Sequence, residues 1–392
     1  MIRWLKQKKS MLLSVLIIVF LSALMMTGCW DYQGLGEQTV VAGIAVDAGD
    51  EGEGYKLTFE IVDLNGAQDG QFGSILLTTT GETLAEAVYD AYARLHGHVY
   101  LGVTDVVIVG RQVAEQVGIR PLVDYLMRDR DARNSLRIAI AGTDTAAELF
   151  RPVAEEGDEG GTQDEEPRLL LSKALGESLS PRRQGARRAT NALAVYEIHH
   201  VLHHGTSDVA LPIVGASDTE DIPFQLDGLA LFTDDRMTGA LPEADMPVYL
   251  LATAGVRDRV FPVEVDGQRA VLAARHSRVR TDFDLDGGVL RFGLDIRVTA
   301  DAQQLPDGWG EMTQPQIRRL ELMAEEAFSA QVEALAERLR AEGHDVFGLA
   351  ETVRSREPGL WEQIAEDWRA WLAASELDAR IEVRVREAGM RR

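Results

Sequence analysis

The sequence predicts an α+β fold of more than one domain, with mixed sheets and packed helices. The chain has 392 residues, which is more than one ordinary hydrophobic core holds. Segments with strand periodicity and segments with helix periodicity are mixed along the chain, and no internal repeat is evident. We therefore expect an N-terminal α+β region over 29–205 and a C-terminal α+β domain with long helices over 206–392.

Residues 1–28 are predicted to be a bacterial lipoprotein signal peptide. A basic segment precedes an apolar run over 11–26, and a threonine and a glycine stand before Cys29. As a helix this run is about 24 Å long, which is short for a hydrocarbon core of about 30 Å. We expect cleavage before Cys29 and a diacylglycerol, with fatty acyl chains such as palmitate, on its sulfur. An uncleaved membrane anchor and a secreted protein with a chance cysteine are the alternatives.

Charge and cysteine content narrow the classes of partner. The formal net charge is −23, and every charged residue before Cys29 is a cation, so the mature chain is still more acidic. This charge disfavours binding to nucleic acid and to anionic lipid headgroups. Cys29 is the only cysteine, so no intrachain disulfide can form. No later segment reaches about 18 consecutive apolar residues, so no further membrane span is expected.

The N-terminal region alternates between strands and helices. Apolar residues in alternation or in short β-branched runs predict strands over 39–47, 55–63, 75–80, 103–109 and 136–141. Apolar residues on one helical face predict helices over 82–95 and 111–127. Gly118 and Pro121 predict a break in the second of these helices. Thr143 or Asp144 is expected to cap a short helix that ends at Phe150.

A predicted linker lies in the second half of this region. Residues 154–166 contain seven acidic residues and three glycines but no large apolar side chain. Such a segment buries too little surface to offset the entropy of ordering, so we expect a mobile linker that divides the region into two subdomains or forms a long loop. Helices are predicted on either side of the basic loop 181–188, over 169–179 and 190–203.

The C-terminal domain is predicted to contain more strands and a long helix. Strand patterns cover 224–232, 260–265, 270–281, 289–299 and 380–386, and a turn follows the first of them over 233–239. Helix patterns cover 244–254 and 316–340, with Gly343 as the end of the long helix. Trp361, Trp368 and Trp371 fall on one face of a single later helix, and core packing explains this stripe better than ligand binding does.

Two clusters of polar residues resemble metal sites. Asp282, Asp284 and Asp286 begin like a calcium loop, but the twelfth position is Gly293 instead of an acid, so a hairpin with a type I′ turn at Asp286-Gly287 is expected.

The other cluster consists of four histidines on one predicted helix. His199, His200, His203 and His204 form two pairs spaced four residues apart, a spacing that suits zinc. No third ligand is identifiable from the sequence, and a solvated helix end before Gly205 explains the residues equally well. We therefore assign no metal site and no cofactor, and zinc binding stays open. No nucleophile elbow, phosphate loop or complete dinucleotide fingerprint is present, so no catalytic residue is assigned.

Four blocks of sequence follow one another along the chain. The first is Gly28-Cys29-Trp30-Asp31, followed by Val41-Ala-Gly43-Ile-Ala-Val-Asp47. The second runs from His98 through Val106-Val-Ile-Val-Gly110 and Gly118-Ile119 to Asp124-Tyr-Leu-Met-Arg128-Asp129 and Arg133. The third is Leu226-Asp-Gly228-Leu-Ala-Leu-Phe232 with Met237-Thr-Gly239-Ala-Leu241. The fourth is His344-Asp345-Val-Phe347-Gly348, followed by Trp361, Trp368 and the final strand.

In this order the blocks resemble the Ger(x)C family, the lipoprotein C subunits of spore germinant receptors. The resemblance implies a non-enzymatic subunit on the outer face of the spore inner membrane, assembled with A-type and B-type membrane subunits and required for germination in response to small nutrients. It also implies partner contacts at Arg128, Asp129 and Arg133 and at the turn that holds Phe232 and Gly239. Packing within the fold is the alternative role for these five residues.

A solute-binding lipoprotein of an importer is the alternative function. Such a protein shares the anchor and the size, but it has two similar lobes with repeating βα units and a ligand cleft between them. A lipid-anchored hydrolase is a third class, and the sequence lacks its motifs.

Overall fold

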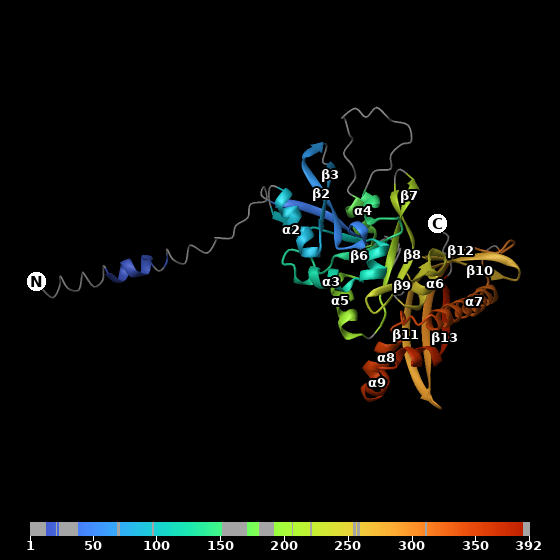
Figure 1. Cartoon of the computed structure of the whole chain (residues 1–392). Coiled ribbons are helices and arrows are strands. Elements are labelled where there is room, and N and C mark those ends of the chain that lie inside the picture. The colour runs from blue at the N-terminus through green and yellow to red at the C-terminus, as the bar shows by residue number, and fades with distance from the viewer. Residues whose placement is uncertain are drawn as a thin grey trace, which may run out of the picture.

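The computed structural model describes residues 13–20, 22, 38–68, 71–95, 98–150, 171–179, 192–205, 207–219, 222–253, 256, 259–309 and 312–386. These residues form two mixed sheets with helices packed on them, which confirms the predicted α+β class (Figure 1). We call the part built on the first sheet, residues 38–242, lobe 1, and the part built on the second sheet, residues 243–386, lobe 2. Within the described ranges, no helix has the length and hydropathy needed to cross a membrane.

Lobe 1 contains a sheet of nine strands among the described residues. They are β1 (Gln38–Ala48), β2 (Tyr55–Gln68), β3 (Gln71–Gly81), β4 (His98–Tyr100), β5 (Val106–Val109), β6 (Arg137–Ala141), β7 (Ala210–Thr219), β8 (Ile222–Thr233) and β9 (Arg236–Pro242). The order is β3-β2-β1-β5-β6-β7-β8-β9, with β4 beside β1. The pairs from β1 to β7 are parallel, and the outer pairs are antiparallel. The two sheets therefore divide after β9, whereas the sequence places the domain boundary at 205.

Helices cover both faces of this sheet. They are η2 (Asp50–Gly52), α2 (Leu84–Arg94), η3 (Val113–Val117), α3 (Arg120–Arg128), η4 (Ala146–Phe150), α4 (Leu171–Leu179) and α5 (Val195–His204). The helices α2, α3 and α5 contribute to one hydrophobic core, and η4 and α4 contribute to another. In β5, Val107 and Val109 belong to the first core, while Val106 and Ile108 belong to the second. All four are fully buried, as expected for a parallel strand that is covered on both faces.

The predicted break in the helix over 111–127 is confirmed. The π-helical segment η3 ends at Gly118, whose φ of 93° is open mainly to glycine, and α3 begins two residues later. A Cβ atom at this position would lie 2.5 Å from Oδ2 of Asp235, in the turn between β8 and β9. The N–H of Ile119 donates to the carbonyl of Asp235 at 2.8 Å. The glycine thus allows the chain to pass close to that turn.

The predicted cap of the short helix η4 is wrong. Thr143 uses its hydroxyl to donate to the carbonyl of Thr145. The first N–H groups of η4, those of Ala146 and Ala147, instead donate to the carboxylate of Asp47 at 2.7 and 3.0 Å. Because β1 ends beside η4, a carboxylate from a distant strand takes the role that the sequence assigns to a local residue.

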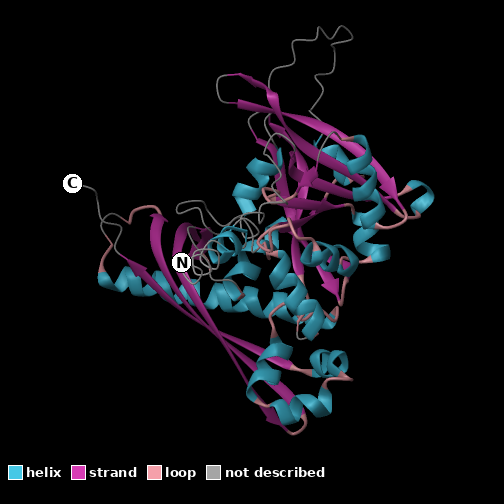
Figure 2. Ribbon diagram, turned by 90° about the vertical axis from the view of Figure 1, so that its left-hand side faces the viewer, coloured by secondary structure: helices cyan, strands magenta, loops and turns pink. Residues whose placement is uncertain are grey.

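Lobe 2 contains a sheet of four strands among the described residues, in the order β10-β11-β12-β13. The strands are β10 (Arg259–Val265), β11 (Gln268–Asp286), β12 (Val289–Gln304) and β13 (Glu376–Arg386). Only β12 and β13 pair in parallel. The helices of this lobe are η5 (Glu243–Asp245), α6 (Met246–Ala252), α7 (Gln314–Ala341), α8 (Leu349–Arg356), α9 (Pro358–Ile364) and α10 (Trp368–Ala374). Figure 2 shows the long strands of this sheet beside the long helix α7.

The helix α7 covers both the face and the edge of this sheet. Its buried residues are Ile317, Leu320, Ala324, Phe328, Val332, Leu335, Ala336 and Leu339. Along its side, Glu321, Glu325 and Glu333 accept hydrogen bonds from backbone N–H groups of the edge strand β13, each at 3.0 Å. These carboxylates satisfy donors that an edge strand otherwise leaves open to another chain.

The hairpin prediction for Asp286-Gly287 is confirmed, with the turn shifted by one residue. Asp286 pairs with Val289, and the two residues between them, Gly287 and Gly288, have φ values of 59° and 84°. Positive φ at both central positions is the signature of a type I′ turn. The aspartates before the turn are therefore residues of β11 rather than of a calcium loop.

The prediction of one helix for the three tryptophans is wrong, but their core packing is confirmed. Trp361 lies in α9, whereas Trp368 and Trp371 lie in α10. The ring centroids of Trp361 and Trp368 are 5.4 Å apart, and all three side chains pack on the core of lobe 2.

Candidate functional site

The two lobes meet at an ion pair between a buried carboxylate and a partly exposed guanidinium. Asp208 lies between α5 and β7 in lobe 1, and both of its carboxylate oxygens accept hydrogen bonds from the guanidinium of Arg369 in α10, at 2.5 and 2.6 Å. The Asp208 side chain is 3% exposed and that of Arg369 is 40% exposed. The same guanidinium also donates to the carbonyl of Gly343 at 2.6 Å. This fork geometry fixes one carboxylate of lobe 1 between two segments of lobe 2.

Asp345 lies directly beside this pair. Its backbone N–H donates to the Asp208 carboxylate at 2.7 Å, and its carbonyl accepts from the N–H of Asp208 at 2.9 Å. The carboxylate of Asp345 is buried and accepts from the N–H groups of Leu349 and Ala350, each at 2.8 Å, so it caps α8. Burial raises the pKa of Asp345 to about 6, although these two hydrogen bonds act in the opposite direction.

His344 closes the junction on the side of β9. It is 3% exposed, and burial lowers its pKa. A Cβ atom added at Gly239 would lie only 2.9 Å from Nε2 of His344, which is too close for an ordinary contact. Gly239 therefore allows β9 to approach lobe 2 closely, which is a packing role for one of the five predicted contact residues.

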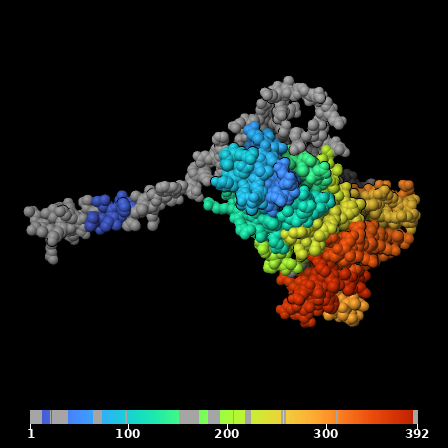
Figure 3. All heavy atoms as spheres, in the orientation of Figure 1, coloured from blue at the N-terminus to red at the C-terminus, as the bar shows by residue number. Residues whose placement is uncertain are grey.

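A small cavity opens at this junction. Arg120, Ser207, Asp208, Asp234, Asp345 and Arg369 supply its polar lining, and its volume is about 40 Å³. Sites for small molecules usually have volumes of about 300–1,000 Å³. The cavity is therefore too small for a nutrient, and the junction is better suited to holding the lobes together. In Figure 3 the surfaces of the two lobes meet along this boundary, between yellow-green and orange.

The other predicted contact residues are in different environments. Phe232 is fully buried in the core of lobe 1, so its side chain packs inside the fold. Arg128 and Arg133 are exposed. Arg133 donates to Oδ1 of Asp105 at 2.6 Å and to the carbonyl of Thr104 at 3.1 Å, so it fixes the loop before β6 to the start of β5. Oδ1 of Asp129 accepts hydrogen bonds from the N–H groups of Asp131 and Ala132 in the same loop.

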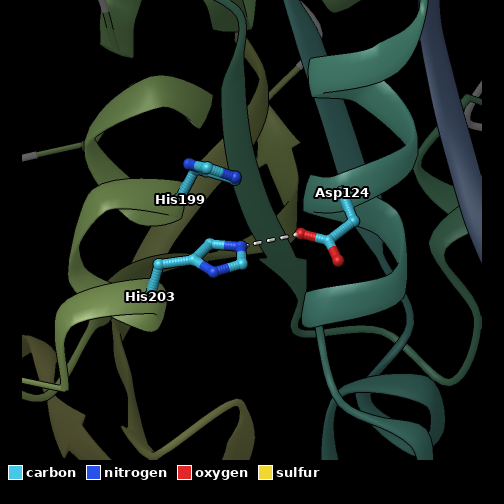
Figure 4. A group of neighbouring side chains, drawn as sticks. All are labelled: Asp124, His199 and His203. Atoms are coloured by element: carbon cyan, nitrogen blue, oxygen red, sulfur yellow. Dashed lines mark hydrogen bonds and ion pairs between the residues drawn. The ribbon is translucent and has the colours of Figure 1, made fainter.

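The histidine cluster lies on α5, and one of its two pairs faces α3. His199 and His203 lie opposite Asp124, and Nε2 of His203 is 3.2 Å from Oδ1 of Asp124 (Figure 4). One ligand atom of each of these three residues lies within 4.8 Å of the others. Partial burial and the neighbouring His203 lower the pKa of His199. Asp124 is a third candidate ligand that helix spacing cannot reveal, because it comes from another helix.

Two further buried carboxylates were not predicted from the sequence. Glu60 of β2 is 1% exposed and accepts from the N–H groups of Leu171 and Ser172 at 3.0 Å, so it caps α4. Asp47 caps η4 in the same way. Burial raises the pKa of both carboxylates. Glu60 alternates with Leu57, Phe59 and Ile61, so the sequence pattern places it on the polar face of the strand and gives no signal of its burial. Cys29 and the segment 154–166 lie outside the described residues.

Comparisons with known proteins find matches in both halves of the chain. A family model described as the spore germination protein N-terminal domain matches residues 31–163, and one described as spore germination B3/GerAC like, C-terminal, matches residues 227–389. The chain is 21% identical to spore germination protein KC of Bacillus subtilis (strain 168), over 96% of this chain and 95% of the relative. It is 22% identical to spore germination protein A3 of the same organism, over 95% of this chain and 97% of the relative.

The fold also matches a solved structure. The crystal structure of the GerBC protein aligns with a TM-score of 0.56 and 15% sequence identity, covering 88% of this chain and 96% of that chain. At this identity the match supports the fold alone. The two family models together span most of the chain in the order that the sequence blocks follow, so the chain belongs to the Ger(x)C family of germinant receptor C subunits and has a role in spore germination.

Proposed function

We propose that this chain is the lipid-anchored, non-enzymatic C subunit of a nutrient germinant receptor, required for germination through assembly with A-type and B-type membrane subunits. The observation that carries the proposal is the match of both family models, in order, across both lobes. A diacylglycerol on Cys29 holds the folded lobes at the outer face of the spore inner membrane. Confinement there raises their effective concentration for the membrane subunits.

The described structure supports a binding role within an assembly. The junction cavity of about 40 Å³ is small for a substrate, and the buried carboxylates at the junction are occupied with capping and pairing. An importer's solute-binding protein would have two similar lobes, whereas here a nine-stranded sheet stands beside a four-stranded one among the described residues. The receptor subunit is therefore the better-supported function.

A Cys29→Ala variant in the native host tests the anchor. We expect less protein in the spore membrane fraction and slower germination, because the acyl chains are lost while the folded lobes keep every described contact. Thr27→Ala is the matched control, since it retains a small residue before an intact cysteine, and it should behave like the wild type. Normal germination and membrane retention of Cys29→Ala would contradict the anchor.

Assembly needs a separate test. Detergent-solubilised spore membranes should yield the A-type and B-type subunits when this chain is captured through an affinity tag. Recovery of the intact chain without them, from spores that contain all three, would contradict the proposed assembly whatever the state of Cys29.

A further inference from the structure

We propose that Asp124, His199 and His203 form a binding site for a divalent transition-metal cation of the zinc type. The three side chains come from two neighbouring helices, α3 and α5, and point toward the space between them (Figure 4). A site at this place would link two helices of lobe 1, so it goes beyond a role for this chain in anchoring and assembly.

The spacing of the ligand atoms fits a tetrahedral ion. Two ligands bound at 2.0–2.1 Å to a tetrahedral zinc ion lie about 3.4 Å apart. Nε2 of His203 and Oδ1 of Asp124 are 3.2 Å apart, and the third ligand atom lies within 4.8 Å of both. The ligand atoms are therefore already close to the separation that a tetrahedral ion requires.

The backbone that carries the ligands is fixed. Helix α3 packs through buried Leu122, Val123 and Leu126, and α5 packs through buried Ile198 and Leu202, all in the same hydrophobic core. A hydrogen bond of 3.0 Å from Arg120 of α3 to the carbonyl of Leu202 joins the two helices directly. Ligands on rigid elements hold their geometry better than ligands on loops do.

The chemistry of the donor set selects the class of ion. Two imidazoles and one carboxylate suit zinc and similar transition metals, whereas calcium and magnesium prefer oxygen ligands throughout. Three protein ligands leave a fourth position for water. The second oxygen of Asp124 lies 3.8 Å from the guanidinium of Arg128, which is an ion-pair contact at the surface.

A simple hydrogen bond between helices is the competing explanation. It accounts for the contact between His203 and Asp124, but it leaves the imidazole of His199, one turn earlier on the same face of α5, without a role (Figure 4). The chain also contains an internal comparison, because His200 and His204 form a second pair on α5 with ring centroids 4.4 Å apart. This pair is absent from the ligand group found among the described residues. The His200/His204 pair therefore serves as an internal control, because it has two imidazoles at the same helical spacing but no carboxylate in the ligand group.

The experiment measures Zn²⁺ binding to the full-length chain in detergent near neutral pH, by titration calorimetry with zinc chloride. We expect one ion per chain in the micromolar range, and affinity lower by at least about tenfold in Asp124→Asn and in His199→Ala. The double variant His200→Ala/His204→Ala should bind like the wild type. Circular dichroism of each variant confirms that it is folded.

Thermal unfolding gives a second readout. Zn²⁺ should raise the melting temperature of the wild type and of the His200→Ala/His204→Ala variant, because an ion that binds only the folded state stabilises it. It should not raise that of folded Asp124→Asn. The proposal is overturned if the wild type binds no zinc, if Asp124→Asn binds as tightly as the wild type, or if the His200/His204 pair proves to be the site.

Discussion

Replacing Arg369 with alanine tests whether the lobe junction stabilises the fold. The substitution removes the fork of hydrogen bonds to Asp208 and the hydrogen bond to the carbonyl of Gly343. It leaves the Asp208 carboxylate, which is 3% exposed, without its cationic partner. We expect the free energy of unfolding to fall, because water cannot easily replace the lost donors at a buried carboxylate.

The size of the effect follows from the burial of the two partners. Hydrogen bonds to charged groups contribute about 1.5–3 kcal/mol, and exposed ion pairs contribute about 0–1 kcal/mol. The pair lies between these cases, since Asp208 is buried while Arg369 is 40% exposed. Asp208 also keeps the N–H of Asp345 as a donor at 2.7 Å. We therefore expect a loss of about 2 kcal/mol.

Urea denaturation near neutral pH, followed by circular dichroism and tryptophan fluorescence, measures this loss. Arg354→Ala is the matched control, because Arg354 makes a similar fork of hydrogen bonds to Glu351, a carboxylate whose side chain is 42% exposed. The control should lose about 0.5 kcal/mol or less. Equal losses in the two variants would refute the reasoning, because they would show that burial of the carboxylate is irrelevant.

The remaining predictions concern a carboxylate and a glycine. The pKa of Asp345 is raised from 3.8 to about 6, so the folded state favours the protonated carboxyl. This contribution to the free energy of unfolding is fully present below pH 3.8 and is lost as the pH rises through 6. Across that range wild-type stability should fall by up to about 3 kcal/mol relative to Asp345→Asn, measured by urea denaturation at a series of pH values. Gly118→Ala should cost at least about 2 kcal/mol in the same assay, because its φ is 93° and the new Cβ would lie 2.5 Å from Asp235.

These two predictions carry their own controls. A pH dependence identical in wild type and Asp345→Asn would show that the pKa of this carboxyl is not raised in the folded state. Gly287→Ala also introduces a side chain at positive φ, but nothing lies within 4 Å of the new Cβ, so about 1 kcal/mol is expected. If Gly118→Ala costs no more than Gly287→Ala, the close approach to Asp235 is not a constraint.

The parts of the fold that the sequence predicts well depend on local chemistry. The turn at Gly287-Gly288 needs positive φ at two adjacent positions, and the glycines supply it whatever packs nearby. The break at Gly118 and the helical pattern of α7 are also local features of the sequence. The single helix for the tryptophans fails because the chain turns between Ile364 and Trp368, where no glycine or proline marks the change.

The candidate sites could not be predicted because their residues meet through the fold. Asp208 and Arg369 are separated by 161 positions, and Asp124 and His203 by 79. The histidine spacing identifies a face of α5 but not the helix that packs against it. The sheet that a strand joins also depends on the fold, because β7 resembles any other strand in sequence and only its register beside β6 shows its place.

The acidity of the chain has a structural role as well as a surface one. With a single cysteine, no disulfide joins distant segments of this chain, and carboxylates that accept backbone N–H groups do so instead. Asp47 reaches η4 across 99 positions, and Glu60 reaches α4 across 111. Glu321, Glu325 and Glu333 connect α7 to β13. Each of these contacts supplies an acceptor to backbone donors at a helix end or a strand edge. The carboxylates must lie inside the fold to do so, and for Asp47 and Glu60 the resulting loss of solvation raises the pKa.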